Sequence, residues 1–294
     1  MNTDSTKTDL LKIIEEKIPT LSKGHRRIAT FIIEHYDKAA YMTAAKLGAQ
    51  VGISESTVVR FADELGFDGY PALQHSLQEI VRNKLTTLQR MEITSDRIGN
   101  SDILDKVVQS DIDKIRITLE RINHEHFNTA IDAIVNAENI YILGMRSSSS
   151  LASFMAFYFN LIFDNARCIN MSGGSETLEQ IMRISDKDVL IGISFPRYSK
   201  RSINAVKYAK SQGAHIVTIT DSNISPIAAY ADSLLLAESD MASFVDSLVA
   251  PLSIINAIIV ATGMKKKEEV AHTFTKLEEI WEKYEVYQKI SEES

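Results

Sequence analysis

The sequence predicts an all-α N-terminal domain followed by an α/β three-layer domain built on a five-stranded parallel sheet. Two observations carry this prediction. Apolar residues recur only at helical spacing up to residue 84. After residue 128, short apolar runs alternate with helical segments, which is typical of parallel strands covered on both faces by helices. We therefore expect domains at residues 1–84 and 128–294, joined by a helical linker at residues 85–127.

The composition is that of a folded protein with two domains. At 294 residues and 32.9 kDa, with 45% hydrophobic and 24% charged residues, the chain can bury a sizeable core, which excludes disordered and collagen-like proteins. The net charge of −7 argues against indiscriminate nucleic-acid binding. Residues 1–84 carry 11 basic and 11 acidic side chains, so the acidic excess lies C-terminal to them and the first domain is free to contact DNA.

Cysteine content and hydropathy bear on the compartment. The single cysteine, Cys168, excludes an internal disulfide and a multi-cysteine metal site, so we expect a reducing compartment and neither metal nor cofactor. Residues 1–12 are mostly polar, unlike a signal peptide. The most apolar stretch, residues 248–264, is interrupted by Pro251 and Ser253 and predicts a buried helix rather than a membrane span. These features predict a soluble cytoplasmic protein with no membrane partner.

Helices are expected throughout the first 127 residues. The N-terminal domain should contain about five, with Ser22 placed to cap one of them. Residues 101–123 predict one long amphipathic helix that packs on its own domain, and whether it also contributes to a dimer interface is left open. The apolar positions of this helix, spaced by three and four, are Leu104, Val108, Ile112, Ile115, Leu119 and Ile122.

The second domain is expected to alternate strands with helices. Helices are predicted at residues 147–162 and 201–212, and Gly213 suits the left-handed end of the latter. The five strand candidates are Asn139–Leu143, Ala166–Asn170, Val189–Ser194, His215–Asp221 and Ser233–Ala237.

One segment carries the spacing of a helix-turn-helix. Two short helices are expected at Ala44–Gln50 and Glu55–Leu65, on either side of a tight turn. Gly48 is small where the helices must touch, Gly52 permits a positive φ in the turn, and Val58 fills the interface from the second helix. An ordinary corner between two helices is the alternative, and it would need only the turn glycine and a serine cap.

The second of these helices is the candidate for reading DNA. Ser54 is placed to cap it, and short polar side chains follow at its start. Hydroxyls and amides there suit phosphate or base edges, Arg60 suits guanine or the backbone, and Glu55 suits a cytosine amino group or the helix dipole. The candidate DNA-binding residues, with Lys46 as a backbone contact, are Lys46, Ser54, Glu55, Ser56, Thr57 and Arg60.

Two strand-to-helix junctions are rich in hydroxyl groups. Gly144 leads into the serines of residues 147–150, and the second junction runs from Ser194 to Lys200 and includes Arg197. Serine hydroxyls beside free amides at a positive helix end suit a phosphate or a carboxylate. Both junctions follow parallel strands, where open α/β sheets bind ligands. The serines could instead be only caps and turn formers, but the basic residues favour a small anionic ligand.

These motifs together resemble the RpiR (MurR/RpiR) family of bacterial transcriptional regulators, whose C-terminal half is a sugar isomerase (SIS) domain with a flavodoxin-like sheet. The resemblance spans about Leu10 to Tyr287. It is most specific in GISESTVVRFADELGFDGYPAL at Gly52–Leu73 and in ISFPRYSKRSINAVKYAKSQGA at Ile193–Ala214. It implies a double-stranded DNA operator as partner, regulation of sugar or amino-sugar metabolism, and a phosphosugar bound between the two loops that alters operator affinity.

The sequence departs from the commoner SIS pattern in both loops. Arg146 stands where a glycine is frequent, and Pro196-Arg197 stands where Ser-Gly is frequent. Since proline lacks a backbone donor and arginine adds a fixed charge, we expect guanidinium groups to hold the anion more than loop amides do. By the resemblance, Ser147 and Ser148 match the first ligand-binding loop and Ser194 and Ser199 the second. The ligand-binding candidates are Arg146, Ser147, Ser148, Ser194, Arg197, Ser199 and Lys200.

An enzyme is the rival class, because SIS domains also serve phosphosugar isomerases and lyases. Such chemistry needs a positioned base. Glu176 and Glu179 are candidates but suit equally the first turn of a helix, and His124 and His126 are expected at the surface. We therefore assign no catalytic residue. A ligand-free interaction module is a third class, which would leave the arginines and serines of the loops without a role.

The expected assembly is a homodimer or homotetramer. Two chains would pair through helices of the α/β domain and present two recognition helices to a palindromic site.

Overall fold

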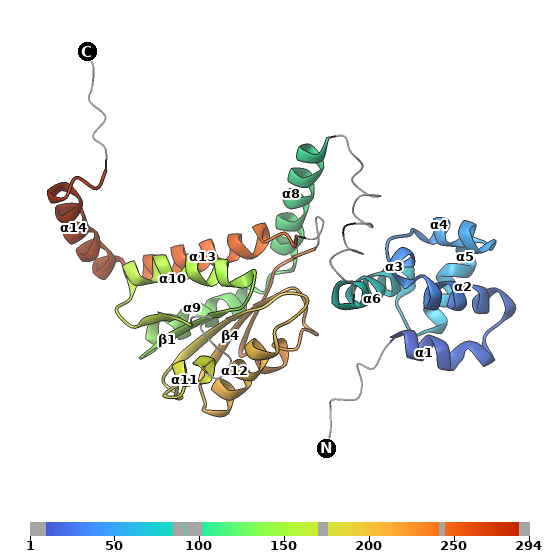
Figure 1. The fold of residues 1–294 in the computed structure, drawn as a ribbon, viewed down its shortest axis with the longest axis horizontal. Coiled ribbons are helices and arrows are strands. Elements are labelled where there is room, and N and C mark those ends of the chain that lie inside the picture. Colours follow the sequence, from blue (N-terminus) through green and yellow to red (C-terminus); the bar gives the residue numbers. More distant parts are fainter. Residues whose placement is uncertain (1–9, 85–90, 92–101, 170–175, 241–244, 288–294) are drawn as a thin grey trace, which may run out of the picture. The chain divides into compact units, whose positions relative to one another are not determined.

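The computed structural model of the chain describes residues 10–84, 91, 102–169, 176–240 and 245–287 (Figure 1). The chain divides into two compact units: the first runs to Ile103 and also includes Val245, and the second comprises the other described residues from Leu104 onward. The helix expected within the linker belongs to the second unit, and a further helix crosses the predicted boundary at residue 128.

The first unit is all-α, as predicted. It contains six α-helices and one 3₁₀ turn among the described residues, where about five helices were expected, because a single-turn helix precedes the helix-turn-helix. These elements are α1 (Leu10–Lys17), η1 (Ile18–Thr20), α2 (Lys23–Glu34), α3 (Tyr36–Ala39), α4 (Ala44–Val51), α5 (Glu55–Glu64) and α6 (Gly69–Lys84). Ser22 caps α2 as predicted, since its hydroxyl accepts a hydrogen bond from the amide of His25.

Helix α6 fixes the chain that enters α4. The Tyr70 hydroxyl and the Gln74 amide both donate to the carbonyl of Met42, at 2.7 and 2.8 Å. Gln78 donates to the carbonyl of Ala40 at 3.0 Å. Burial raises the pKa of Tyr70 to about 12, so this hydroxyl remains a donor at any physiological pH. The start of the helix-turn-helix is thus held by three side chains of one helix.

The second unit contains the predicted sheet of five parallel strands, in the order β2-β1-β3-β4-β5. The strands are β1 (Ile140–Gly144), β2 (Ala166–Cys168), β3 (Val189–Ile193), β4 (His215–Thr220) and β5 (Ser233–Leu236). Each strand begins and ends within two residues of its predicted bounds. Asn170, the predicted end of the second strand candidate, lies outside the described residues. The other elements are α8 (Ile103–Arg121), α9 (His124–Asn136), α10 (Ser148–Ile162), α11 (Glu176–Gln180), α12 (Lys200–Ser211), η2 (Ala228–Tyr230), α13 (Val249–Lys265) and α14 (Lys267–Lys283).

Both faces of the sheet are buried, which makes the unit three-layered (Figure 1). In β1, Ile140 and Ile142 pack into the core formed with α9, α10 and α13, whereas Tyr141 and Leu143 pack into the core formed with α12. This alternation follows from the two-residue period of a strand. Because every position of β1 is buried, the strand reads as a continuous apolar run in the sequence.

Helix α8 has an unexpected orientation. Five of its six predicted apolar residues are exposed, from 38% for Ile115 to 74% for Leu104, whereas Ile122, just after the helix, packs against the core of the second unit. The buried residues of α8 are Lys114 and Thr118. The helix therefore packs on its own unit, as expected, but through polar side chains. Its apolar face is exposed, and a contribution of this face to a dimer interface stays a prediction.

Helix α13 buries one face, which includes Ile254, Ile255 and Ile258, so the predicted buried helix is confirmed for that face only. Among the described residues no single helix is both long and apolar enough to cross a membrane, and α13 and α14 meet that test only as a pair bent by 97°.

Two side chains near the sheet, His126 and Cys168, are partly buried. His126, expected at the surface, accepts a hydrogen bond through Nδ1 from the amide of Leu234 at 3.0 Å, and so satisfies a donor on the edge strand β5. Cys168 is half-buried at the end of β2, and burial raises the pKa of its thiol.

His215, the first residue of β4, predicts how the stability of the second unit depends on pH. Its Nε2 lies 3.0 Å from the Ser233 hydroxyl, and burial lowers its pKa from the ordinary 6.5, an effect that Asp232 partly opposes. The unfolded chain then binds more protons than the folded one as the pH falls below about 6.5, so the free energy of unfolding should decrease there.

Lowering the pH from about 7.5 to 5.5 should decrease the free energy of unfolding of wild type more than that of His215→Gln. Urea unfolding followed by fluorescence of Trp281, the only tryptophan of the chain, reports this unit. Equal pH dependence in the two proteins would show that His215 does not contribute.

Candidate functional site

The helix-turn-helix forms as its spacing predicts. A Cβ on Gly48 would lie 2.8 Å from the carbonyl oxygen of Ile53, so only glycine permits this approach of α4 to the turn. Gly52 has a φ of +69°, in the left-handed region. Val58 is fully buried between the helices. All three positions thus have the roles that the sequence pattern assigns to them.

The start of α5 differs from the prediction in one respect. Ser54 occupies the N-cap position, but its hydroxyl caps no backbone amide. Its Oγ instead lies 3.0 Å from Ser56 Oγ and 2.8 Å from Thr57 Oγ1, so the side-chain cap predicted for Ser54 is wrong. The three hydroxyls form one cluster at the helix start.

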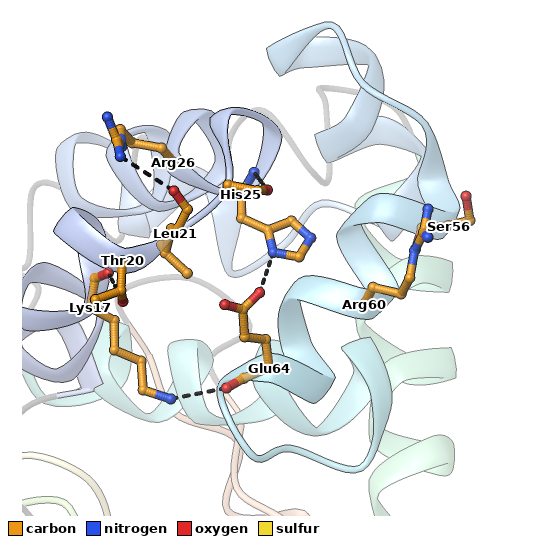
Figure 2. A network of polar contacts seen from close by, with 9 residues as sticks. Lys17, Thr20, Leu21, His25, Arg26, Ser56, Arg60 and Glu64 are labelled. Atoms are coloured by element: carbon orange, nitrogen blue, oxygen red, sulfur yellow. Dashed lines mark hydrogen bonds and ion pairs between the residues drawn. The ribbon is translucent and has the colours of Figure 1, made fainter.

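The predicted DNA-contacting side chains lie at the open end of α5 and on α4. Lys46, Ser54, Glu55, Ser56 and Arg60 are exposed and Thr57 is half-buried. Figure 2 shows the Arg60 side chain lying toward Ser56, and its Nε donates to the Ser56 carbonyl at 3.3 Å. The guanidinium is therefore held near the N-terminal turn, where a recognition helix meets base edges.

The other end of α5 is anchored by α1 and α2 (Figure 2). His25 Nδ1 pairs with the carboxylate of Glu64, and Lys17 Nζ donates to the Glu64 carbonyl at 2.9 Å. The His25 ring also meets Phe61 edge-on, with ring centroids 5.6 Å apart. These contacts hold the C-terminal half of α5, whereas Glu55 and Ser56 in its N-terminal turn are exposed.

The two serine loops come together because β1 and β3 are neighbours in the sheet. Gly144 pairs with Ile193, so both loops leave the sheet at the same edge. They line one small pocket, whose cavity volume is about 30 Å³. Its lining residues are Met145, Arg146, Ser147, Ser148, Ser194, Phe195, Pro196, Arg197, Ser199 and Asp246. Of the predicted ligand-binding residues, only Lys200, which is exposed at the start of α12, is not among them.

Two arginines of this pocket have left-handed backbones. Arg146 has a φ of +58° and Arg197 a φ of +62°. A non-glycine residue at such angles costs about 1–3 kcal/mol, and residues in strained backbone conformations are concentrated at functional sites. At both positions the commoner SIS pattern has glycine. The left-handed backbone explains why glycine is frequent at these positions. In this chain the same positions carry guanidinium groups that line the pocket.

In the first loop, more backbone amides are hydrogen-bonded to carbonyls of the same loop than expected. The amides of Ser148, Ser149 and Ser150 donate to the carbonyls of Met145, Arg146 and Ser147 at 3.0–3.3 Å, so the prediction of free amides is wrong for these three serines. The Ser149 hydroxyl also donates to the Arg146 carbonyl at 2.5 Å. Arginine and the remaining hydroxyls are therefore the main donors for an anion in this loop.

Gly144 allows the first loop to pass close to the backbone at the end of β1. A Cβ on Gly144 would lie 2.3 Å from the carbonyl oxygen of Ser148, which no side chain tolerates. The loop thus folds back over the end of β1.

The second loop is fastened to the neighbouring strand. The Tyr198 hydroxyl donates to Asp221 Oδ1 at 2.8 Å, and the Thr220 hydroxyl donates to the same oxygen at 3.2 Å. Asp221 directly follows β4. Sequence reasoning missed this contact and also Asp246, because Asp221 and Asp246 lie outside both serine junctions.

The carboxylates considered for catalysis lie elsewhere. Glu176 and Glu179 occur in the first turn of α11, as the helix-dipole alternative expects, and neither lines the pocket. Within the described ranges, no three His, Cys, Asp or Glu side chains are placed to hold a metal ion.

A helix-turn-helix unit joined to an α/β unit with a polar pocket defines a class of protein, a DNA-binding regulator with a ligand-binding domain. Comparison with protein families agrees. The model described as "Helix-turn-helix domain, rpiR family" matches residues 8–84, and the model described as "SIS domain" matches residues 133–261. The chain belongs to the rpiR family of helix-turn-helix transcriptional regulators, with a SIS domain as its second unit.

Relatives along most of the chain are regulators. An uncharacterized HTH-type transcriptional regulator of Caldanaerobacter subterraneus is 24% identical over 277 residues, 93% of this chain and 97% of its own. The HTH-type transcriptional regulator HexR of Pseudomonas aeruginosa is 23% identical over 272 residues, 89% and 91% of the two chains. This chain is accordingly a transcriptional regulator and not an enzyme.

Solved structures share the fold. The NanR protein of Vibrio vulnificus, complexed with ManNAc-6P, has a TM-score of 0.58 at 21% identity and covers 93% of this chain and 98% of its own. The sugar isomerase domain of an RpiR transcription factor from Sphaerobacter thermophilus has a TM-score of 0.56 at 24% identity and covers 59% and 97%.

Glycine and alanine at position 197 should separate charge from backbone strain. Both remove the guanidinium, but only glycine relieves the left-handed φ, so Arg197→Gly should be more stable than Arg197→Ala by about 1 kcal/mol. Urea unfolding measures this difference. Arg201, an exposed residue within α12, is the control position, where glycine should be less stable than alanine by about 1 kcal/mol. The same order at both positions would contradict the assigned strain.

Proposed function

We propose that this regulator senses a sugar phosphate in the pocket between its two serine loops and that the bound ligand changes its affinity for a DNA operator. The observation that carries the proposal is the pocket itself, in which two arginines and four serines converge from neighbouring strand ends. Guanidinium groups match phosphate oxygens in pairs, and serine hydroxyls donate to the same oxygens.

Burial supports this assignment. Ser148 and Ser194 are 3% and 4% exposed, so a phosphate that they contact is partly withdrawn from water, where hydrogen bonds to an anion are stronger. The likeness in fold to NanR, which was solved with ManNAc-6P, supports a phosphorylated sugar as the anion and amino-sugar metabolism as the regulated process.

The DNA partner is a double-stranded operator read by α5. The exposed residues at the start of α5, with Lys46 on α4, would contact phosphates and base edges. Since operator DNA and sugar phosphates occur in the cytoplasm, the protein would act there.

Pairing of two chains would match a palindromic operator. The second unit exposes apolar side chains on several helices, including Val260 and Met264 of α13 at 60% and 75% and Phe157 of α10 at 63%. Leu104 and Leu119 of α8 add exposures of 74% and 68%. Apolar surface of this kind typically marks an interface, and a homodimer, or a tetramer built from it, would cover it.

Ligand and operator must affect each other equally. If the sugar phosphate binds one arrangement of the protein better than another, the coupling free energy, typically about 1–3 kcal/mol, changes operator affinity by the same factor by which DNA changes sugar affinity.

A panel of sugar phosphates, amino-sugar phosphates and sugar acids, screened by thermal shift, tests the ligand class, because a ligand of the folded state raises the melting temperature. A panel without hits would contradict a sugar-phosphate sensor of these classes.

Two substitutions should separate the two sites. Arg60→Ala should weaken binding to an operator fragment selected from random DNA by about 1–3 kcal/mol and leave ligand binding unchanged. Ser194→Ala should weaken ligand binding by about tenfold or more and leave DNA binding without ligand unchanged. Fluorescence anisotropy and calorimetry measure the two affinities.

Matched controls for these variants lie on each unit. Lys12→Ala removes an exposed charge from α1, and Ser211→Ala removes an exposed hydroxyl at the end of α12. If Arg60→Ala binds the operator as wild type does, α5 does not read DNA as proposed.

A further inference from the structure

Asp246 lines the sugar pocket but belongs to neither serine loop. It comes from the segment between β5 and α13, and it brings a carboxylate to a wall otherwise made of arginines, hydroxyls and apolar groups. A carboxylate repels a phosphate, but it accepts hydrogen bonds from the hydroxyl or amino groups of a sugar. The pocket therefore offers groups for both parts of a sugar phosphate.

The residue that follows Asp246 is fixed to α8. The Ser247 hydroxyl donates to Asp111 Oδ1 at 2.6 Å, and Ser247 is 8% exposed. Its backbone is held as well, because Ser247 N donates to the Asp240 carbonyl at 3.2 Å and the Ser239 hydroxyl donates to the Ser247 carbonyl at 2.9 Å. The position of Asp246 at the pocket thus depends on Ser247, which is hydrogen-bonded to Asp111 of α8.

The same helix holds the chain just after β5. Thr118 Oγ1 accepts from the amide of Glu238 at 2.8 Å, and Arg121 pairs with the Glu238 carboxylate at 3.1 Å. We call these contacts the α8 clasp, which consists of Asp111, Thr118 and Arg121 on α8 with Glu238 and Ser247. Because Asp111 and Thr118 are seven residues apart, they lie on one face of the helix.

The clasp explains why the inward face of α8 is polar. A helix usually buries an apolar face, yet α8 buries Lys114 and Thr118 and exposes its apolar residues. Hydrogen bonds such as those of the clasp can be exchanged for bonds to water at a small net cost in free energy. Helix α8 can therefore detach from this surface more readily than a helix held by apolar packing. Helix α8 also begins at Ile103, where the first unit ends.

We propose that Asp111 is a positioning residue of the sugar pocket. Through Ser247 it holds Asp246 at the pocket wall, and through the same bond the occupied pocket acts on α8, the first helix of the second unit. This inference rests on the proposed function of the pocket as a sugar-phosphate site.

Hydrogen exchange of the full-length chain tests the clasp without any ligand. We expect amides of residues 245–248 to exchange faster in Asp111→Ala and in Ser247→Ala than in wild type. Asp113→Ala is the matched control, because Asp113 is an exposed acid on the same helix that pairs with Arg116. Unchanged exchange in both test variants would overturn the proposal.

A second arm uses glucose 6-phosphate, glucosamine 6-phosphate and ManNAc-6P as probes. For any probe that binds wild type, Asp111→Ala should raise Kd by about tenfold, the effect of losing one hydrogen bond to a charged group, and Asp113→Ala should not. Asp111→Asn should retain most of the affinity, since its amide oxygen can still accept from Ser247. The probe should slow exchange of α8 amides in wild type but not in Asp111→Ala.

The two arms distinguish the possible failures. If no probe binds wild type, the sugar-phosphate function fails for these ligands, while the ligand-free exchange still decides whether Asp111 positions the pocket segment. If Asp111→Ala lowers the melting temperature but changes neither Kd nor the response of α8 to the probe, Asp111 is only structural and the proposal is overturned. If Asp111→Ala does not fold, Asp111→Asn and Ser247→Ala supply the same comparison.

Discussion

Parallel pairing of β1 with β3 is the constraint on which the ligand-binding unit depends. In a parallel sheet every strand ends at the same edge, so the segments that follow β1, β3, β4 and β5 must meet there. The paired residues Gly144 and Ile193 set the two serine loops side by side. A slip of one residue would turn the apolar side chains of one core toward the other, and burial on both faces therefore fixes the register.

The pocket at this edge combines charge with backbone strain. Arg146 and Arg197 adopt a conformation that suits glycine, and the fold retains them there. The surrounding contacts show what holds the loops, since Ser149 bonds the Arg146 carbonyl and Tyr198 bonds Asp221. Loops held in this way would need little rearrangement to bind the proposed anion, which would reduce the entropy lost on binding.

Local patterns in the sequence predict much of this structure. The spacing of Gly48, Gly52 and Val58 predicts the helix-turn-helix because one turn brings these residues together, and short apolar runs predict all five strands. Contacts between distant residues are not predictable in this way: Ser247 meets Asp111 across 136 positions and His126 meets Leu234 across 108. Periodicity also shows which residues of α8 share a face, but not which face the rest of the chain covers. At Ser54, a hydroxyl cluster and a backbone cap are local alternatives that the sequence does not distinguish.

Cys168 makes this protein convenient for spectroscopy. It is the only cysteine of the chain, it is half-buried, and burial raises the pKa of its thiol. At neutral pH the thiol is therefore largely protonated, and maleimide reagents, which attack as the thiolate forms, label it slowly. A cysteine introduced at an exposed site on α5 or α8 would react first, so a single dye could be attached to either helix while the native cysteine is retained.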